Sequence, residues 1–396
     1  MNGISSRQIN IFSIQHQNFN GHWHHLASAL ANSFHSKNYK TNLICPTLYS
    51  PNGEKYDVDN SLNPVIGMTP NFWDKKTIKS FISSIQSNRG YSIMYDGRIP
   101  LLLQALIASR NMNKDSMFYL NILGASIERR NKFIDFRYFI TKWTLLIVKS
   151  QNRVQILSES KELQEYIQRI SKLETIVFPV FAPTTFKKNT KNTKIGNLVI
   201  LEQGEKSDFA ISEVNNTLKI TDSNIEITIW TGNPTKSLLD AQKLNNDKRL
   251  KFTFGYLDSD SYDLIMQQNF RHIYVYSIDR YEFRTSGKLM ESIALNKSLV
   301  IPDGGTFPGL AEKFYGSNFQ KFKFYPGDLA SVLLSTPISS QQNKAWNSDK
   351  SVEELEKANL FDQKSKTRIN IFNYIACIGL LICIKLIYRK KDEMSK

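Results

Sequence analysis

The chain has only three cysteines among its 396 residues, too few for the disulfide framework that holds small secreted domains together. It opens on polar residues, and the apolar run from Ile9 to Ile14 is too short for the hydrophobic region of a secretory signal. Its length is enough for two domains of ordinary size plus a tail, and hydrophobic residues make up 41% of the chain. We therefore expect a globular protein in a reducing compartment.

The sequence also lacks a recognised nucleic-acid-binding motif, and its densest basic block is only Arg389-Lys390-Lys391. The formal net charge is nevertheless +15, which favours an anionic partner or surface. Because the chain has an apolar tail as well, we expect a membrane surface as the partner and no nucleic acid. Two alternatives stay open, namely a lysine-rich surface that only keeps the protein in solution and a basic nucleic-acid-binding module.

Long apolar runs are scarce, and the longest candidate is residues 369–388. At about 1.5 Å per residue, this segment is long enough to cross a hydrocarbon core of about 30 Å. Asn370, Asn373 and Lys385 interrupt it, so an interfacial helix or a helix packed on a partner is the alternative. We predict a single C-terminal membrane helix, with the rest of the chain on the cytoplasmic face of the membrane.

The remaining sequence alternates strand-like and helix-like segments in two series. In the first series strands are predicted at 9–14, 41–45, 91–95, 117–123, 154–158 and 175–179, with helices at 26–34, 100–109 and 133–149 and after 158. In the second series strands are predicted at 198–201, 225–230, 251–254 and 273–276, with helices at 209–218, 237–244 and 262–268. Alternation of this kind predicts mostly parallel sheets with helices on both faces.

The polar, basic stretch at 183–196 separates the two series and reads as a linker. We therefore predict one α/β domain over 1–182, a second over 197–335, and a polar spacer over 336–368 with a possible helix at 352–359. Ligands of doubly wound sheets bind outside the carboxyl ends of the strands. An active site in a cleft between the two domains is the expected arrangement.

The most informative stretch runs from Arg284 to Gly305 and reads as a small-residue loop, a short helix, an Asn stop, a buried strand and a glycine turn. Ser286 and Gly287 place free backbone N–H groups at the helix start, which Arg284 and Lys288 bracket with positive charge. Such a site suits a diphosphate, and Glu291, one turn later, can reach a sugar hydroxyl. The plainer alternatives are an ordinary capped helix and a surface Lys–Glu pair.

This stretch resembles the nucleotide-sugar segment of GT-B glycosyltransferases in the broad glycosyl-transferase-family-4-like group. The matching residues are Ser286-Gly287, Glu291, Ile293-Ala294, Leu299-Val300-Ile301-Pro302, the turn Asp303-Gly304-Gly305 and the later Pro326-Gly327-Asp328. The resemblance is strong over about fifty residues, and beyond them only the order of elements matches. Phe283 stands where many retaining members carry another glutamate, and Glu282 lies one residue away.

The resemblance implies two Rossmann-like, doubly wound domains, with the acceptor bound by residues 1–182 and a nucleoside-diphosphate sugar bound by residues 197–335. It implies a glycosyltransferase that needs no cofactor, in which the leaving diphosphate is stabilised by Arg284, Lys288 and the backbone at Ser286-Gly287. The acceptor is expected to be a saccharide or a lipid-linked saccharide in cell-surface polysaccharide or glycolipid synthesis. A catalytically inactive GT-B relative that serves as a membrane-associated scaffold is the alternative.

The loop and helix start at Gly21-His22-Trp23-His24-His25 are the unusual feature of the first half. In GT-B enzymes this loop borders the transfer site, so Gly21 would make room for the sugar, and His22 or His24 would be the base that takes the acceptor proton. Asp96, at the end of a predicted strand, is a third candidate base. Structural histidines and an ordinary turn are the alternatives. We predict no metal, because the loop offers no carboxylate or cysteine.

A three-residue match to the metal motif D-x-D occurs at Asp258-Ser259-Asp260. Matches this short arise often by chance, and Asp57-Val58-Asp59 gives another. Asp and Ser are preferred at helix N-caps. We therefore interpret residues 258–261 as a helix start.

Overall fold

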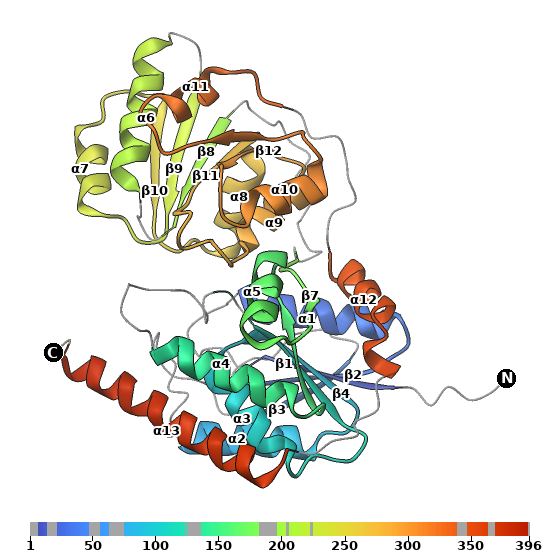
Figure 1. Cartoon of the computed structure of the whole chain (residues 1–396). Coiled ribbons are helices and arrows are strands. Elements are labelled where there is room, and N and C mark those ends of the chain that lie inside the picture. The colour runs from blue at the N-terminus through green and yellow to red at the C-terminus, as the bar shows by residue number, and fades with distance from the viewer. Residues whose placement is uncertain are drawn as a thin grey trace. The chain divides into compact units, whose positions relative to one another are not determined.

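In the computed structural model, the chain divides into two compact units, Met1–Pro179 together with Ser348–Lys396, and Val180–Asn347 (Figure 1). The structure describes residues 7–13, 22–46, 56–62, 75–122, 124, 136–181, 196–202, 206–221, 225–338, 347–362 and 369–394. The predicted linker at 183–196 lies almost entirely outside these residues.

The first unit is built on a seven-stranded sheet with the order β3-β2-β1-β4-β5-β6-β7, in which every pair of neighbours is parallel. Its strands are β1 (Gln8–Phe12), β2 (Lys40–Pro46), β3 (Asp57–Leu62), β4 (Tyr91–Gly97), β5 (Met117–Ile122), β6 (Val154–Ser158) and β7 (Ile176–Val177). The interior strand β5 is buried along its whole length, as expected for a parallel strand covered on both faces.

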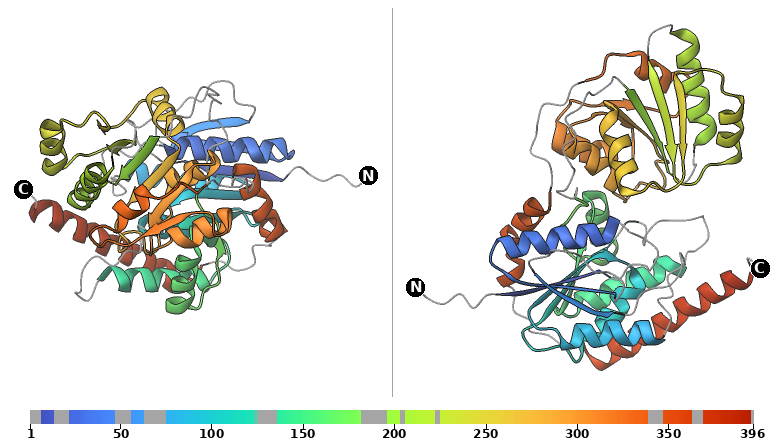
Figure 2. Two further views of the ribbon diagram at one scale, coloured as in Figure 1. Left: turned by 90° about the horizontal axis from the view of Figure 1, so that it is seen from above. Right: turned by 180° about the vertical axis from the view of Figure 1, so that it is seen from behind.

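Helices cover both faces of this sheet. They are α1 (His22–Ser36), α2 (Lys75–Ser87), α3 (Ile99–Ser109), α4 (Phe136–Lys149), α5 (Lys161–Ser171), α12 (Ser348–Lys357) and α13 (Ile371–Met394). α12 packs on α1 on one side, while α2, α3, α4 and α5 follow one another and α13 lies on α3 and α4 (Figures 1 and 2). The predicted alternation of strands and helices is therefore present in this unit.

Residues 348–362, which we predicted to be part of a polar spacer, instead belong to the first unit. Val352 and Leu355 of α12 are buried, and Ser33 of α1 donates a hydrogen bond to Ser348 over 2.7 Å. Lys37 forms an ion pair of 2.8 Å with Glu356. The helix has an apolar face as well as its charged one, and α1 covers the apolar face.

The C-terminal helix α13 corrects a second prediction. Its residues Cys377 and Ile384 are buried, and Asn373 donates a hydrogen bond to Ser150 at the end of α4 over 2.7 Å. In the part of the chain that the structure describes, no helix has the length and apolar character needed to cross a membrane. This finding overturns the predicted single-pass helix at 369–388 and the membrane localisation that depended on it. Polar residues such as Lys385 interrupt the apolar run.

The second unit has a six-stranded sheet with the order β10-β9-β8-β11-β12-β13, again parallel throughout. Its strands are β8 (Gly196–Leu201), β9 (Glu226–Thr231), β10 (Leu250–Phe254), β11 (Arg271–Val275), β12 (Ser298–Pro302) and β13 (Gln320–Phe322). Its helices are α6 (Ser207–Ile220), α7 (Lys236–Leu244), α8 (Ser259–Gln268), α9 (Gly287–Ala294), α10 (Phe307–Tyr315) and α11 (Asp328–Leu334).

In this unit α6, α7 and α11 lie on one face of the sheet and α8, α9 and α10 on the other (Figure 1). Val199, Ile229 and Ile273, from three neighbouring strands, belong to the buried core beneath α6 and α11. Because all six strands are parallel, their carboxyl ends share one edge of the sheet. The start of α9 follows β11 at that edge, so the fold places the informative stretch where such sheets bind ligands.

Candidate functional site

The start of α9 has the local structure that its residue types favour. Ser286 is the N-cap, with extended backbone, and its hydroxyl accepts a hydrogen bond from the N–H of Leu289 over 3.3 Å. Gly287 and Lys288 open the helix, and N–H groups of a first turn have no acceptor within the helix. The helix ends where predicted, since Asn296 has a φ of 53°, which stops the helix in the left-handed conformation.

β11 supports α9 from below through a chain of buried polar groups. The Tyr274 hydroxyl donates a hydrogen bond of 2.6 Å to the carbonyl oxygen of Lys288 and lies 2.5 Å from the Ser292 hydroxyl. On the same face of the strand, His272 Nδ1 lies 2.5 Å from that hydroxyl. Burial lowers the pKa of His272 to about 3, so this imidazole is neutral near pH 7. These contacts fix the first turns of α9 on the sheet.

Glu291 is nearly fully buried, with 3% of its surface exposed. Its carboxylate accepts a hydrogen bond from the Tyr262 hydroxyl on α8. Burial, together with the neighbouring Glu291, raises the pKa of Tyr262 well above its usual value, so the phenol keeps the proton that it donates. The plain alternative of a surface Lys–Glu pair is excluded, because Glu291 is turned inward and held by α8.

The ammonium group of Lys288 lies over the indole ring of Trp230, with its nitrogen 3.9 Å from the ring centroid. Trp230 lies near the carboxyl end of β9 and is 3% exposed. Its indole nitrogen has no hydrogen-bond partner among the described residues. Burial lowers the pKa of Lys288 to about 8, and the carboxylates of Glu291 and Glu202 oppose part of that shift. A titratable cation therefore stands beside the start of α9.

Two arginines share one carboxylate at the same edge of the sheet. Glu202 directly follows β8, and its carboxylate oxygens lie 3.6 Å from Arg280 Nε and 3.9 Å from Arg284 Nη1. Together with Lys288 and Glu291, these residues form a group of five side chains with three cations and two carboxylates. The excess of positive charge and the N-terminus of α9 both favour an anionic ligand.

The glycine turn after β12 packs directly on the connection that leads to α9. Gly305 has a φ of +67°, and a Cβ there would lie 2.7 Å from the carbonyl oxygen of Tyr281. Thr306 donates a hydrogen bond through its hydroxyl to the carbonyl oxygen of Arg284. The glycine therefore lets two segments approach closely, and the turn holds the arginine-bearing connection in place.

The later turn at Pro326-Gly327-Asp328 serves an internal contact. The buried carboxylate of Glu213 on α6 accepts hydrogen bonds from the N–H groups of Gly327 and Ala330, over 2.8 and 3.0 Å. A protein carboxylate therefore already occupies the start of α11. Of the two helix starts that the resemblance singled out, α9 is the one that suits a ligand.

The structure brings the five predicted donor residues, Arg284, Ser286, Gly287, Lys288 and Glu291, together at one edge of the second sheet. Phe283, at the position of the first glutamate in many retaining enzymes, is buried, whereas Glu282 beside it is exposed. Besides Glu291, Glu202 supplies a carboxylate at this edge.

The predicted residues of the first unit are described only in part. α1 begins at His22 and contains His24, and Asp96 lies within β4, which continues to Gly97 instead of stopping at residue 95. The side chains of these three residues, and Gly21 altogether, lie outside the described residues. The backbone places the start of α1, which follows β1, and the end of β4 at one sheet edge, because β1 and β4 are parallel neighbours.

Three site residues escaped the sequence reasoning. Glu202 and Trp230 lie at the ends of two correctly predicted strands, where parallel sheets gather ligand-binding groups, and that position was an available signal. Tyr262 lies inside a predicted helix and carried no local signal. Its role depends on a contact with Glu291, 29 residues further along the chain.

The D-x-D match begins α8 as we interpreted it. Asp258 is the N-cap, and its carboxylate accepts a hydrogen bond from the N–H of Ser261 over 2.8 Å. Among the described residues, no group of three histidine, cysteine or acidic side chains is placed to hold a metal ion.

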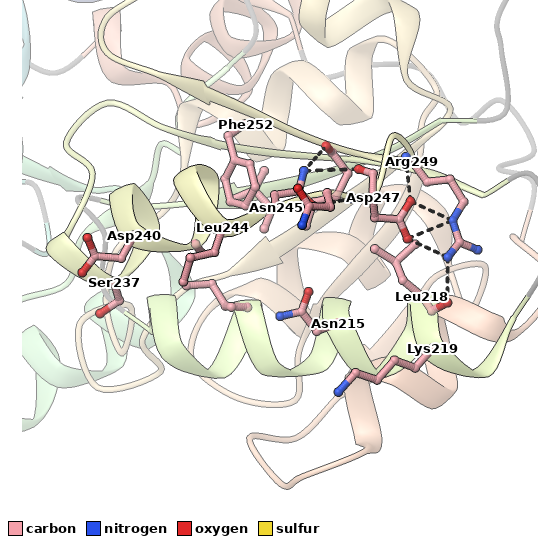
Figure 3. A pocket seen from close by; sticks show the side chains of 15 residues that line it. Asn215, Leu218, Lys219, Ser237, Asp240, Leu244, Asn245, Asp247, Arg249 and Phe252 are labelled. Carbon is pink, nitrogen blue, oxygen red and sulfur yellow. Dashed lines mark hydrogen bonds and ion pairs between the residues drawn. The ribbon is translucent and has the colours of Figure 1, made fainter.

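A separate groove of about 680 Å³ opens between α6 and α7, over β9 and β10 (Figure 3). Leu218, Leu244 and Phe252 line it together with polar side chains, and Arg249 at one end is tied to Asp247 by an ion pair of 2.6 Å. α6 and α7 lie on the opposite sheet face from α9, and none of the predicted donor residues lines this groove.

No protein-family model matches the sequence, and no curated protein matches it. Solved structures match in fold. The glycosyltransferase AviGT4, involved in avilamycin A biosynthesis, has a TM-score of 0.57 at 7% identity, covering 91% of this chain and 100% of its own. A glycosyltransferase from Rickettsia africae has a TM-score of 0.53 at 11% identity, covering 98% of both chains.

A putative UDP-N-acetylglucosamine 2-epimerase from Listeria monocytogenes is similar to the same degree, with a TM-score of 0.56 at 11% identity over 92% of this chain and 99% of its own. Identities this low establish the fold and nothing finer. The chain therefore has a two-domain GT-B fold, as predicted.

Proposed function

We propose that this protein is a glycosyltransferase that moves a sugar from a nucleoside-diphosphate sugar to a saccharide or lipid-linked acceptor. The observation that carries the proposal is the start of α9, where Lys288, Arg284 and the first-turn N–H groups of Gly287 and Lys288 stand beside the buried Glu291. Family-4-like membership and a role in cell-surface polysaccharide or glycolipid synthesis are part of the same proposal. The neighbours named above include glycosyltransferases and a nucleotide-sugar epimerase, which supports a sugar-nucleotide ligand.

The proposed chemistry follows from the charges at this edge of the sheet. When the bond between the sugar carbon and the diphosphate breaks, negative charge grows on the leaving oxygen. Lys288, Arg284 and the N-terminus of α9 are preorganised to stabilise that charge without a required metal. Glu291 would accept hydrogen bonds from ribose hydroxyls. In the first unit we propose acceptor binding near Gly21, with His22, His24 or Asp96 as the base that takes the acceptor proton.

Binding is tested first, with a thermal-shift panel of nucleoside diphosphates and their sugars on the full chain. A ligand present at 100 times its Kd stabilises the native state by about 2.7 kcal/mol, which is readily measured. Glu291→Ala should lose most of that shift. Glu312→Ala, an exposed glutamate on the adjacent helix α10, is the matched control and should keep it. A panel without any shift would refute the nucleotide-sugar site.

Product analysis then separates the remaining possibilities. Incubation with the nucleotide sugar that binds best, with and without oligosaccharide acceptors, should give a glycosylated acceptor and free nucleoside diphosphate. If the nucleotide sugar is epimerised in the absence of an acceptor, the proposed activity would be epimerisation instead of sugar transfer. Tight binding with no turnover by either route would favour the inactive relative.

A further inference from the structure

We propose that Lys288 takes up a proton when a nucleoside diphosphate binds at the start of α9, and that Trp230 is the residue that positions Lys288 for this. The inference rests on the proposed function, since it concerns the same donor site. It adds a positioning residue that was not among the predicted site residues and a proton that donor binding consumes. In the free protein a fraction of the Lys288 side chains is neutral, and in each of these the amine gains one proton from solvent and becomes an ammonium ion beside the diphosphate.

Geometry is the first support. The Lys288 nitrogen lies 3.9 Å from the centroid of the Trp230 ring, and an indole face attracts a cation without accepting a conventional hydrogen bond. Among the described residues, no hydrogen bond or ion pair of this nitrogen is found. In its ammonium form the side chain is therefore held over the ring, and its three N–H groups are available to an acceptor. Diphosphate oxygens at the start of α9 would supply one.

The nearest carboxylate on the same helix is already engaged elsewhere. Glu291 accepts the hydrogen bond from Tyr262, which draws its carboxylate toward α8. Tyr262 in turn packs edge-on against Trp230, with ring centroids 5.5 Å apart. The two aromatic residues therefore hold the two donor-binding side chains in fixed positions, with Trp230 holding Lys288 and Tyr262 holding Glu291.

The other charged side chains of the site leave the protonation of Lys288 responsive to a ligand. The ionisable groups near it are Glu291 on α9, Glu202 after β8, Arg280 and Arg284 between β11 and α9, Tyr262 on α8, and Tyr274 and Tyr276 on or just after β11. Glu202 is shared by both arginines, so it offers Lys288 only part of a counter-charge. Burial accordingly lowers the pKa of Lys288 to about 8.

The sign of the coupling follows from these groups. A diphosphate brings negative charge close to the amine, which favours the protonated form and raises the pKa in the complex. Between the two pKa values the complex holds more protons than the free protein, so binding takes up a proton. Donor affinity should therefore fall as the pH rises above about 8, more steeply than titration of the ligand explains.

Calorimetry on the full chain measures the proton directly. The ligand is whichever of UDP, GDP and ADP gives the largest thermal shift. It is titrated at about pH 8.5 in Tris and in tricine, two buffers whose ionisation enthalpies differ. At a pH about half a unit above the pKa of free Lys288, binding should take up roughly three-quarters of a proton. Lys288→Arg should bind the same nucleotide with no uptake, because a guanidinium stays protonated. Trp230→Leu should bind more weakly and take up less, because solvent then reaches the amine. Trp143→Leu, the same change at a half-exposed residue of the first unit, is the matched control.

The outcomes separate the inference from the function on which it rests. Uptake in the natural protein that disappears in Lys288→Arg supports the inference. Nucleotide binding without uptake, or with equal uptake in Lys288→Arg, overturns it and leaves the donor site standing. If Lys288→Arg fails to bind, unchanged uptake in Trp230→Leu overturns it. Absence of nucleotide binding by the natural protein refutes the proposed function and the inference together.

Discussion

The hydroxyl of Tyr262 on α8 donates a hydrogen bond to the carboxylate of Glu291 on α9. One helix therefore fixes the only carboxylate of its neighbour, at the sheet edge where the donor site is proposed. This contact and the other buried polar contacts of the second unit lead to four predictions.

Tyr262→Phe removes the hydrogen bond to Glu291 and keeps the ring. A buried carboxylate that loses a donor costs about 1–3 kcal/mol, so the free energy of unfolding should fall by that order in urea titrations. Nucleotide affinity should fall as well, since Glu291 is no longer held. Tyr325→Phe, at a residue that is 66% exposed, is the control. Equal stability of the two variants would contradict the buried contact.

Glu213→Ala removes the carboxylate at the start of α11 and leaves the N–H groups of Gly327 and Ala330 without their acceptor. Loss of such a cap costs about 0.5–2 kcal/mol, with a further cost for groups left buried. We expect a lower midpoint of urea unfolding with an unchanged slope. Glu312→Ala provides the exposed comparison, and a midpoint equal to that of Glu312→Ala would count against the assignment.

Gly305→Ala tests the close approach of two segments beside the donor site. Gly305 combines a φ of +67° with a carbonyl oxygen 2.7 Å from any added Cβ, whereas Gly327, in the left-handed conformation with a φ of +85°, has open space around it. Alanine at either position carries the cost of a positive φ, about 1 kcal/mol or more, and only Gly305→Ala carries the clash. Gly305→Ala should be clearly the less stable of the two variants in thermal unfolding. Similar losses in Tm would show that the turn can shift to make room for the added Cβ.

His272 makes the free energy of unfolding of the second unit depend on pH in the acidic range. Burial, with Lys297 nearby, lowers its pKa to about 3 in the native state, whereas an imidazole in an unfolded chain titrates near 6.5. The unfolded state therefore binds more protons between these values. The contribution of His272 is complete above about pH 6.5 and is lost as the pH falls toward 3.

His272→Gln should reduce the difference between the free energies of unfolding at pH 7 and at about pH 4.5. His35→Gln, the same change at a partly exposed residue of α1, is the comparison variant. The measurement is urea unfolding at both pH values. An unaltered difference in His272→Gln would show that the pKa of this imidazole is the same in the native and unfolded states.

Local sequence signals predicted the fold well because each strand and each helix is formed by contiguous residues. The apolar runs at β8, β11 and β12 and the small residues at Ser286 and Gly287 need no distant contact to be recognised. β3 was missed because an edge strand with Asp57, Asp59 and Asn60 has no apolar run. The sequence could show which residues start α9, and from the strand ends it could have shown Glu202 and Trp230.

Contacts between distant segments could not be predicted in this way. Ser33 and Ser348 are 315 residues apart, and nothing in the charged sequence of α12 indicates that α1 covers its apolar face. The same holds for α13. Its apolar residues predicted a membrane helix, and the sequence gives no sign that it packs on α3 and α4. The positions of such segments in the fold depend on tertiary contacts.

The return of residues 348–396 to the first unit affects how the chain is made. A ribosome completes the whole of the second unit before it releases α12 and α13. The nascent first unit must therefore wait with the buried surfaces of α1 and α3 uncovered, during which a chaperone would find them accessible. The second unit is continuous in sequence and has no such delay, so its fold should form first although it is encoded later.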